Sequence, residues 1–410
     1  MRRVAITGIG VIAPVGNTAG EFFANLMAGR SGIRHIRAPF VERLAVRVAG
    51  QVDFDPAAHF SRIKLGYLDR FSQFALVASA EAVRDAGLQL SDADKLVTGV
   101  YLGTGLGGAH ALEEAISELF RNGGPRIKPL TVVLAMNNAA ASQIALEHGL
   151  QGPNQTVSTA CASSAIAIGE AFRAIRHGYA EVMIAGGAEA LLTLGTIKSW
   201  EALRALAMED PLDPGASCRP FSLDRSGLVL GEGAAILVLE EMERARARGA
   251  QIHAELKGYG TANDAANITK PARHGQVRAM EAALHDARLA TADIDYINAH
   301  GTATPVGDTV ETQAIKQVFG DHARRLAVSS TKSMHGHLMG ASGAVEFAAA
   351  VLAIRHRAIP PTMHLRKPDP ECDLDYVANS GRADARVRCV MSNTFGFGGS
   401  NAVLIAQALG

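Results

Sequence analysis

The sequence from residue 155 reads Gln155-Thr156-Val157-Ser158-Thr159-Ala160-Cys161-Ala162-Ser163-Ser164, and an Ala/Ile-rich run continues it to His177. The first residues predict a β-strand, and the Ala/Ile-rich run predicts a helix. A thiol at such a corner suits a nucleophile, because the free N–H groups and positive dipole end of the helix favour a thiolate and, later, an oxyanion. The alternative is a buried structural cysteine, since free cysteine is among the most buried residue types.

The helical part of this stretch is echoed later in the chain. Ser-Ser-Ala-Ile at 163–166 and Ala-Ile-Arg-His at 174–177 parallel Ser-Gly-Ala-Val at 342–345 and Ala-Ile-Arg-His at 353–356, at a constant offset of 179 residues. The echo predicts two similar α/β halves, residues 1–250 and 251–410, that pack together. A site between two halves can draw catalytic groups from both. A chance match of two Ala-rich helices is the alternative.

Short Val/Ile-rich runs alternate with Ala/Leu-rich helical patterns in both halves, which predicts layered α/β packing. The segments are 4–9, 22–28, 74–86, 97–102 and 109–120 in the first half, and 254–259, 276–287, 295–299, 328–330, 342–354, 388–391 and 402–406 in the second.

Composition places the chain among globular proteins with a large core. Of its 410 residues, 48% are hydrophobic and 20% charged. Lys+Arg and Asp+Glu both number 40, so no basic field recruits nucleic acid and no acidic bias predicts disorder. The four cysteines, Cys161, Cys218, Cys372 and Cys389, lack any metal-ligand spacing. This pattern argues against a disulfide framework and a cysteine zinc site, and it fits a reducing cytoplasm.

The N-terminus imitates a signal peptide, because Arg2 and Arg3 precede an apolar run. That run contains Gly8, Gly10 and Pro14 and lacks a small-residue cleavage site, so we expect a buried first strand. No window approaches the roughly 18 to 20 uninterrupted apolar residues that a membrane span needs. No membrane association is therefore expected.

Two histidines follow predicted strands in the second half. His300 lies in Asn-Ala-His-Gly-Thr-Ala-Thr-Pro at 298–305, and His337 lies in Lys-Ser-Met-His-Gly-His-Leu-Met-Gly at 332–340. Singly, each would more often be an ordinary loop or core histidine. Because α/β sheets bind ligands at the carboxyl ends of their strands, we expect both imidazoles to lie near Cys161.

A third candidate segment is the glycine-rich stretch Ser-Asn-Thr-Phe-Gly-Phe-Gly-Gly-Ser-Asn at 392–401. So many glycines allow a loop to bring backbone N–H groups close to a substrate and to move. A plain turn between two strands is the alternative.

Taken together, four ordered motifs resemble those of the β-ketoacyl-[acyl-carrier-protein] synthases, the elongating condensing enzymes of dissociated fatty acid synthesis. They are Thr-Ala-Cys-Ala-Ser-Ser at 159–164, His-Gly-Thr-Ala-Thr-Pro at 300–305, Lys-Ser-Met-His-Gly-His-Leu at 332–338 and Asn-Thr-Phe-Gly-Phe-Gly-Gly at 393–399. The resemblance covers essentially the whole chain. It implies an α/β thiolase-like fold of duplicated βαβαβαββ halves in αβαβα layers, a homodimer without a cofactor, and acyl- and malonyl-loaded acyl carrier protein as partner.

The resemblance also implies a decarboxylative condensation that lengthens an acyl chain by two carbons. Cys161 would hold the acyl chain as a thioester, with the backbone N–H groups of Cys161 and Phe397 as the oxyanion hole. His300 and His337 would bind the thioester carbonyl of the malonyl group and stabilise the enolate formed when carbon dioxide leaves. Neutral imidazoles suit this task because each donates one N–H while remaining uncharged.

Further roles follow from the same resemblance. Lys332 and Glu346 match a lysine and an acid that support the site electrostatically, with an ordinary ion pair as the alternative. Phe395 and Phe397 match a gating pair, in which Phe397 blocks the malonyl side until Cys161 is acylated. The substrate and carrier contacts would be Thr302 and Thr304 for the pantetheine arm, Leu106, Trp200 and Met339 for the acyl pocket, and Lys64, Arg126, Lys128 and Arg204 for carrier docking. Ordinary core packing is the alternative for Trp200, and solvated surface charge is the alternative for each of the four basic residues.

Two departures qualify the resemblance. His335 stands where the family usually has threonine, and the resulting His335-x-His337 pair suggests a metal site. The nearby Lys332 repels a cation and no third ligand is evident, so no metal is expected. The basic cluster for the carrier is thinner over residues 62–70 than is usual in fatty acid enzymes, which suggests a dedicated carrier of a secondary-metabolite pathway.

Other functions fit the sequence less well. Gly8-x-Gly10-x-x-Ala13 mimics a dinucleotide fingerprint of a nicotinamide oxidoreductase, but Pro14 obstructs the helix that should receive the pyrophosphate. Chain-length factors resemble this family but lack the reactive cysteine, so the chain would be the ketosynthase subunit of any such heterodimer. A thiolase would need a second catalytic cysteine near the C-terminus, where the glycine-rich loop carries Phe397 instead and Cys389 lies within the preceding predicted strand. An enzyme limited to acyl transfer also remains open.

Overall fold

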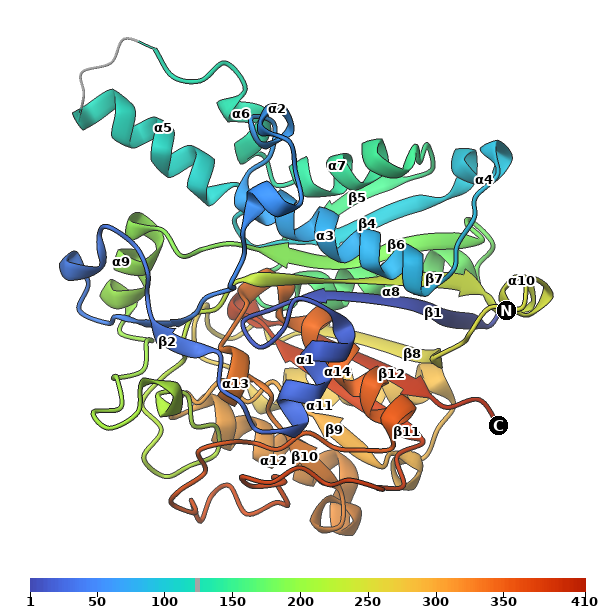
Figure 1. The fold of residues 1–410 in the computed structure, drawn as a ribbon. Coiled ribbons are helices and arrows are strands. Elements are labelled where there is room, and N and C mark those ends of the chain that lie inside the picture. The colour runs from blue at the N-terminus through green and yellow to red at the C-terminus, as the bar shows by residue number, and fades with distance from the viewer. Residues whose placement is uncertain (122–125) are drawn as a thin grey trace.

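The chain forms a ten-stranded mixed β-sheet that folds around two central helices, in a computed structural model that describes residues 1–121 and 126–410 (Figure 1). The first half contains β1 (Val4–Ile12), α1 (Ala19–Met27), β2 (Ile33–His35), β3 (Val48–Gly50), α2 (Arg62–Leu65), α3 (Arg70–Asp85), α4 (Asp92–Val97), β4 (Gly99–Gly103), α5 (Ala109–Arg121), α6 (Thr131–Ala135), α7 (Ala139–His148), β5 (Asn154–Val157), α8 (Ser163–Arg176), β6 (Val182–Glu189), α9 (Leu194–Leu203), β7 (Gly233–Glu241) and α10 (Met242–Ala247).

The second half contains fewer elements in a similar order. These are β8 (Ala254–Asn263), α11 (Arg273–Ala287), β9 (Tyr296–Asn298), α12 (Gly307–Phe319), β10 (Ala327–Ser329), α13 (Lys332–His335), the 3-10 turn η6 (Met339–Ala341), α14 (Ser342–His356), β11 (Cys389–Phe395), the 3-10 turn η7 (Phe397–Gly399) and β12 (Ser400–Gln407).

Both halves build the same five-stranded sheet. The strand order is β5-β4-β6-β7-β1 in the first half and β10-β9-β11-β12-β8 in the second, which is third, second, fourth, fifth, first in each. In each half the fifth strand, β7 or β12, is antiparallel to both of its neighbours. A short antiparallel ladder between β1 and β8 joins the halves into one sheet. The expected duplication of the fold is confirmed.

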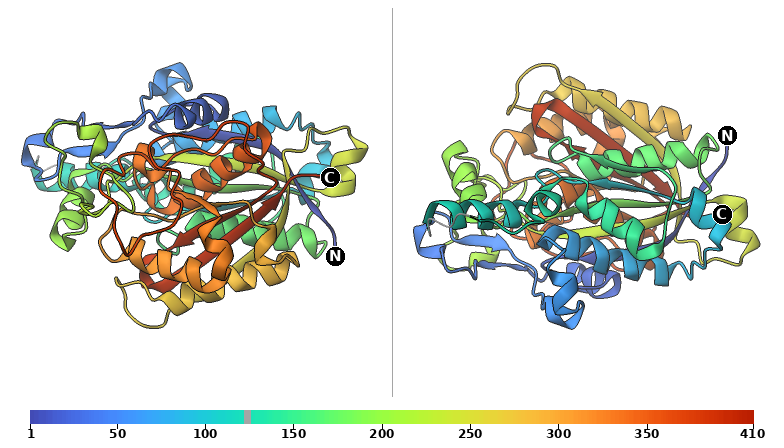
Figure 2. Two further views of the ribbon diagram at one scale, coloured as in Figure 1. Left: turned by 90° about the horizontal axis from the view of Figure 1, so that it is seen from below. Right: turned by 90° about the horizontal axis from the view of Figure 1, so that it is seen from above.

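The helices lie in three layers around the two halves of the sheet. Figure 1 shows α8 and α14 between the halves, with α3 and α7 on one outer face and α11 and α12 on the other. This αβαβα arrangement is the one that the resemblance implied. The views in Figure 2 show both chain termini at the same end of the molecule.

Small residues allow the central helices to pack closely. A Cβ added at Gly343 of α14 would lie 2.8 Å from the Ala165 side chain of α8, and one added at Gly103 of β4 would lie 2.2 Å from the Ser164 nitrogen. The Ser164 hydroxyl accepts a hydrogen bond from the Ala344 N–H at 2.9 Å. These contacts hold the N-terminal ends of α8 and α14 against each other.

The glycines near the N-terminus have a packing role rather than a phosphate-binding one. Gly8 and Gly10 lie inside β1, whose residues are all buried, as the sequence predicted. A Cβ at either position would lie about 2 Å from a carbonyl oxygen of α3, at 2.1 Å and 1.9 Å respectively. The dinucleotide fingerprint therefore marks a strand that packs tightly on a helix.

The predicted segments match most of the long elements within a few residues of their ends. No predicted segment corresponds to the strands β6 and β7, to the helices α7, α9 and α12, or to the short elements β2, β3, α2, α4, α6 and α13. Both β6 and β7 are fully or almost fully buried and are flanked by strands on both sides, so they carry no alternating polar pattern. Among the described residues, no helix combines the length and apolar character needed to span a membrane.

Candidate active site

Cys161 lies at a sharp corner between β5 and α8. Ala160, the preceding residue, has a left-handed backbone with φ of 51°. The Ser163 hydroxyl donates to the Ala160 carbonyl at 2.6 Å and accepts from the Thr159 N–H at 2.8 Å, which fixes the turn. The thiol is thus held just before the first turn of a 14-residue helix whose N-cap residue, Ala162, offers no capping side chain. The strand-to-helix corner predicted from the sequence is confirmed.

His300 and His337 meet Cys161 in one cavity. The His337 Nε2 atom lies 3.1 Å from the Cys161 sulfur, and the two imidazole ring centres are 5.4 Å apart. One potential ligand atom from each of the three residues lies within 4.8 Å of the other two. All three side chains are buried. The structure therefore brings the three residues together as the sequence predicted.

The hydrogen bonds of His337 define which ring nitrogen carries its proton. The backbone N–H of Met339 donates to His337 Nδ1 at 3.1 Å, and the Ser342 hydroxyl lies 2.8 Å from the same atom. Because a backbone N–H can only donate, Nδ1 is the acceptor and the neutral ring carries its proton on Nε2. That proton points toward the Cys161 sulfur.

Lys332 fixes His300 in the same tautomer. Its amino group contacts three acceptors, namely His300 Nδ1 at 3.4 Å, the His300 carbonyl at 2.6 Å and a Glu346 carboxylate oxygen. An ammonium has three protons to donate and no lone pair, so His300 Nδ1 accepts and Nε2 carries the ring proton. Both Lys332 and Glu346 are fully buried behind the histidines.

Burial and Lys332 keep the imidazoles neutral. Burial is the main cause that holds the pKa of His300 and of His337 well below 6.5, and the charge of Lys332 lowers both further. Burial raises the pKa of Glu346 to about 7, while Lys332 acts in the opposite direction. The site is therefore a pair of neutral N–H donors beside one buried cation.

Burial raises the pKa of the Cys161 thiol to about 11, and the charge of Lys332 opposes this rise. The backbone N–H groups of Phe397, in η7, and of Cys161 itself, just before α8, also lower this pKa. Both N–H groups therefore favour negative charge near the position of the sulfur.

The glycine-rich segment forms the end of β11, η7 and the start of β12. Phe395 is buried with its ring edge toward His300, at 6.0 Å between ring centres, whereas the Phe397 ring lies 5.7 Å from that of Trp200. Gly398 and Gly399 both have φ of 79°, a conformation that glycine adopts without strain. Phe397 is thus attached to a turn that glycine alone accommodates easily.

The cavity has a volume of about 320 Å³ and contains most of the predicted substrate residues. Thr302 and Thr304 line it, with their hydroxyls 3.0 Å apart. Trp200 lines the same cavity, and Arg204 lies at its exposed side. Met339 is buried in the apolar cluster that contains Cys161. Leu106 differs, because its side chain is 56% exposed and lies outside the cavity lining.

The remaining predicted docking residues lie on the surface, away from the cavity lining. Lys64 pairs with Glu147, and Lys128 donates to Glu114 at 2.6 Å, while Arg126 is exposed. Sequence reasoning missed the stretch 264–271, which also lines the cavity. Asp264 directly follows β8. Its position at the end of a strand, which also identified His300, could have indicated it from the sequence.

His335 does not join the catalytic cluster. Its Nδ1 donates to the Gly336 carbonyl at 2.7 Å, and its Nε2 accepts from the Thr331 hydroxyl at 2.9 Å. Burial lowers the pKa of His335 to about 3, with Lys332 adding to the effect.

A thiol and two imidazoles can bind soft metal ions, and Cys161, His300 and His337 are such a group. The Nε2 atoms of His300 and His337 carry protons, however, so they have no free lone pair for a metal ion.

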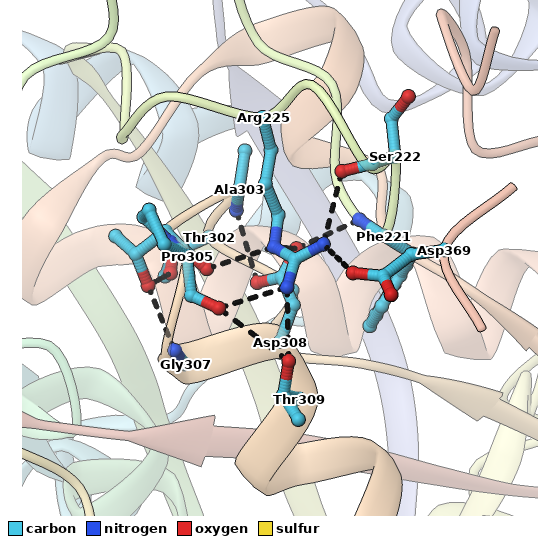
Figure 3. Close-up of polar contacts among 12 residues, drawn as sticks. Phe221, Ser222, Arg225, Thr302, Ala303, Pro305, Gly307, Asp308, Thr309 and Asp369 are labelled. Atoms are coloured by element: carbon cyan, nitrogen blue, oxygen red, sulfur yellow. Dashed lines mark hydrogen bonds and ion pairs between the residues drawn. The ribbon is translucent and has the colours of Figure 1, made fainter. Parts of the chain in front are cut away.

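Arg225 braces the loop that follows His300 (Figure 3). Its buried guanidinium donates to the carbonyls of Thr304 at 3.1 Å, Pro305 at 2.8 Å and Ser222 at 2.9 Å. It also donates to the Thr309 hydroxyl and pairs with the Asp369 carboxylate. Five acceptors on three segments thereby hold the threonine-bearing wall of the cavity in place.

Three comparisons with known proteins agree with this geometry. The profile of the β-ketoacyl synthase N-terminal domain matches residues 1–245, and that of the C-terminal domain matches residues 253–366. The 3-oxoacyl-[acyl-carrier-protein] synthase 2 of Staphylococcus aureus strain N315 is 44% identical over 409 residues, which are 98% of each chain.

The similar solved structures are ketosynthases, and their likeness confirms the thiolase-like fold. The ishigamide ketosynthase/chain length factor superposes with a TM-score of 0.93 at 38% identity, and a type II polyketide ketosynthase in complex with its acyl carrier protein superposes with a TM-score of 0.92 at 35% identity. Each covers 100% of both chains. These comparisons do not favour a nicotinamide oxidoreductase.

We predict that His300 and His337 do not take up a proton between pH 8 and pH 6. Their pKa values lie well below 6.5, so the neutral form is kept across this range. In a protein labelled at histidine, the ring nitrogen resonances of both residues should keep the pattern of a neutral imidazole from pH 8 to pH 6. Assignment through His300→Ala and His337→Ala identifies the signals. A midpoint above pH 6 for either ring would contradict the prediction.

We predict that Arg225→Lys destabilises the protein. Lysine has three donors instead of five and no planar fork, so at least two of the acceptors around residue 225 lose their hydrogen bond. At about 1–3 kcal/mol for each unsatisfied buried acceptor, the free energy of unfolding should fall by about 2–6 kcal/mol in denaturant titration. Arg382→Lys is the control, because Arg382 makes one exposed ion pair, and such pairs contribute about 1 kcal/mol or less. Equal effects of both changes would refute the bracing role.

Proposed function

Because this chain belongs to the β-ketoacyl synthase family, we propose that Cys161, His300 and His337 are the residues that carry out its reaction. The chain is a condensing acyltransferase, which elongates an acyl chain with the malonyl group of malonyl-acyl carrier protein. One observation supports the assignment above all. A thiol and two neutral imidazole N–H donors converge within 4.8 Å in a single cavity.

In the first half-reaction, the Cys161 sulfur attacks the carbonyl carbon of an acyl-carrier thioester. The negative charge that develops on the carbonyl oxygen would be stabilised by the backbone N–H groups of Cys161 and Phe397, both of which lower the pKa of the Cys161 thiol in the free enzyme. Collapse of the intermediate breaks the bond to the carrier sulfur, which leaves as a thiol with the proton of Cys161. The acyl chain is then a thioester on Cys161.

In the second half-reaction, the malonyl thioester places its carbonyl oxygen between the Nε2–H groups of His300 and His337. The C–C bond to the carboxylate breaks, carbon dioxide leaves, and its electron pair forms an enolate whose oxygen both donors stabilise. The enolate carbon attacks the Cys161 thioester, and the Cys161 sulfur leaves and is reprotonated. The product is a β-ketoacyl-carrier protein two carbons longer.

Lys332 and Glu346 would maintain the donors rather than touch substrate. Lys332 holds His300 Nδ1 as an acceptor and, as a cation, disfavours an imidazolium on either ring. Glu346 compensates the buried ammonium, which would otherwise be costly to desolvate. No metal or cofactor enters this reaction scheme.

The rest of the cavity suits the two arms of the substrate. The hydroxyls of Thr302 and Thr304 would hydrogen-bond the pantetheine arm along the wall that Arg225 braces. The acyl chain would enter the apolar cluster that contains Cys161 and Met339 and against which Trp200 packs. Phe395 and Phe397 would form the gate, and Phe397 would stand aside once Cys161 is acylated.

Acyl carrier protein would dock at the cavity mouth. Arg204, at the exposed side of the cavity, would contact an acidic carrier there, and Lys64, Arg126 and Lys128 would complement it on the surface away from the cavity lining. A second subunit would cover the edge of β5, which within the described residues pairs with β4 alone and is partly exposed, together with exposed apolar residues of α5 and α6. This subunit is a second copy of the chain or a related chain-length factor, as in the ishigamide structure. We also propose that the protein is cytoplasmic and that its two halves divide near residue 250.

The central test loads Cys161 from acyl-carrier proteins of differing length, adds malonyl-carrier protein and identifies products by mass. We expect β-ketoacyl products two carbons longer from the unmutated enzyme. Cys161→Ala should abolish condensation, and His300→Ala or His337→Ala should slow it by about 100-fold or more, as loss of one oxyanion donor does in other enzymes. Cys218→Ala is the control, because Cys218 is another buried free thiol. A folded dimer that condenses no acyl chain would sink the proposal.

We predict that Phe397→Ala removes the requirement that Cys161 be acylated before malonyl-carrier protein reacts. The unmutated enzyme should decarboxylate malonyl-carrier protein slowly until Cys161 is acylated, whereas the variant should release carbon dioxide without prior acylation, because no ring blocks the malonyl side. The variant keeps its backbone N–H, so acylation itself should persist. Phe397→Leu retains an apolar side chain of similar bulk and should preserve the order. If acylation rates, order and chain-length preference all stayed unchanged in Phe397→Ala, Phe397 would not be the gate.

A further inference from the structure

A buried carboxylate joins the two halves of the protein immediately behind the catalytic histidine. Glu189 ends β6 and is fully buried. Its carboxylate accepts four hydrogen bonds, from the backbone N–H groups of Gly105, Leu106 at 3.2 Å and Gly340 at 3.0 Å, and from the Thr104 hydroxyl at 3.0 Å. The first half thus contributes the carboxylate and three donors, and the second half contributes Gly340.

The Gly340 contact is one residue from the hydrogen bond that sets the His337 tautomer. Met339 donates its N–H to His337 Nδ1, and the next N–H, that of Gly340, points at Glu189. Met339 has a left-handed backbone with φ of 46°, a conformation that a methionine adopts only when its surroundings hold it. Glu189 is the anchor on the C-terminal side of this strained residue.

No space is left around Gly340 for a side chain. A Cβ added at Gly340 would lie 2.4 Å from the Gly105 nitrogen and 2.6 Å from a Glu189 carboxylate oxygen. The loop after β4 and the turn η6 therefore meet only because residue 340 lacks a side chain. Movement of the carboxylate would be transmitted directly to the Met339–Gly340 peptide.

We propose that Glu189 is a positioning residue for His337. By holding the Gly340 N–H, it keeps Met339 in its left-handed conformation, so the Met339 N–H stays on His337 Nδ1 and the proton of the ring stays on Nε2. This inference rests on the proposed function, in which His337 Nε2–H stabilises the enolate. Glu189 touches no substrate, and it acts only through the turn that leads from His337 into α14.

If Glu189 positions His337, its loss should slow decarboxylation more than acylation of Cys161. Acylation uses the N–H groups of Cys161 and Phe397, which Glu189 does not contact, whereas decarboxylation uses the Nε2–H of His337. Glu189→Gln keeps the shape of the side chain but replaces one acceptor oxygen with an NH2 group, so at least one backbone N–H loses its acceptor in either orientation of the amide. The Gly340 N–H also no longer faces a charged carboxylate, whose hydrogen bonds are about twice as strong as those of a neutral acceptor. A misplacement of about 1 Å at a reacting group can cost up to about 100-fold in rate.

The test measures Cys161 acylation and malonyl-carrier decarboxylation separately in Glu189→Gln. We expect decarboxylation and condensation to fall by at least about 10-fold relative to acylation. Glu81→Gln is the matched control, because Glu81 also accepts two backbone N–H groups, from Val11 and Ala19, each at 2.8 Å. The control should keep the unmutated ratio of the two rates. A Glu189→Gln enzyme with an unchanged ratio would overturn the inference.

Two further measurements keep the proposal testable if Glu189→Gln does not fold. Gly340→Ala retains the Glu189 carboxylate, but its Cβ would force the Gly340 N–H and this carboxylate apart, and it should lower decarboxylation selectively in the same way. In the unmutated protein, the nitrogen resonances of a labelled His337 should report an unprotonated Nδ1, and a protonated Nδ1 would overturn the inference. Failure of the unmutated enzyme to condense would instead count against the proposed function, which the nitrogen resonances do not test.

Discussion

The site depends on the close contact between the N-terminal ends of α8 and α14. Ser164 and Ala344 share a hydrogen bond of 2.9 Å across it, and Gly343 leaves no room for a side chain. Cys161 immediately precedes the first of these helices, and His337 precedes the second by one short turn. A larger residue at 343 would separate the helices and, with them, the thiol and the imidazole that now lie 3.1 Å apart.

The site also contains a buried positive charge on Lys332, which Glu346 compensates. A buried cation is expensive to desolvate, and Lys332 is fully buried beside Glu346 of α14 and the loop of His300. Glu346 supplies the compensating carboxylate, and the His300 carbonyl and ring supply the other acceptors. The arrangement places a positive charge beside both imidazoles, so that neither protonates and both remain N–H donors. Stability and reactivity thus rest on the same ammonium group.

The sequence predicted the parts of this site that follow from short-range pattern. The corner at Cys161, the strand-end placement of His300 and the echo between α8 and α14 are visible in residues 163–177 and 342–356, and the structure contains all three. Strands β6 and β7 were missed because strands buried on both faces lose the alternation that periodicity detects.

Contacts between distant segments were beyond sequence reasoning for a different reason. Nothing near residue 225 indicates that its guanidinium binds carbonyls 79 and 80 residues away, and nothing near residue 189 indicates a partner at residue 340. Such contacts depend on how the halves pack and not on local composition. His335 was identified as unusual from its motif, but only the fold shows that its two nitrogens are occupied by Gly336 and Thr331.

The duplication of the fold places a reactive residue before the N-terminus of a central helix in each half, although the two residues need different electrostatic support. In each half the third strand leads to a central helix, β5 to α8 and β10 to α14, and the reactive residue precedes that helix. The positive dipole end of α8 favours negative charge on the Cys161 sulfur or on a bound oxyanion. The positive end of α14 disfavours an imidazolium at His337, and free N–H groups near its start, such as that of Met339, reach His337 Nδ1. A helix N-terminus therefore supports an anion at one position and a neutral donor at the other, and a condensing enzyme needs both within reach of a single thioester.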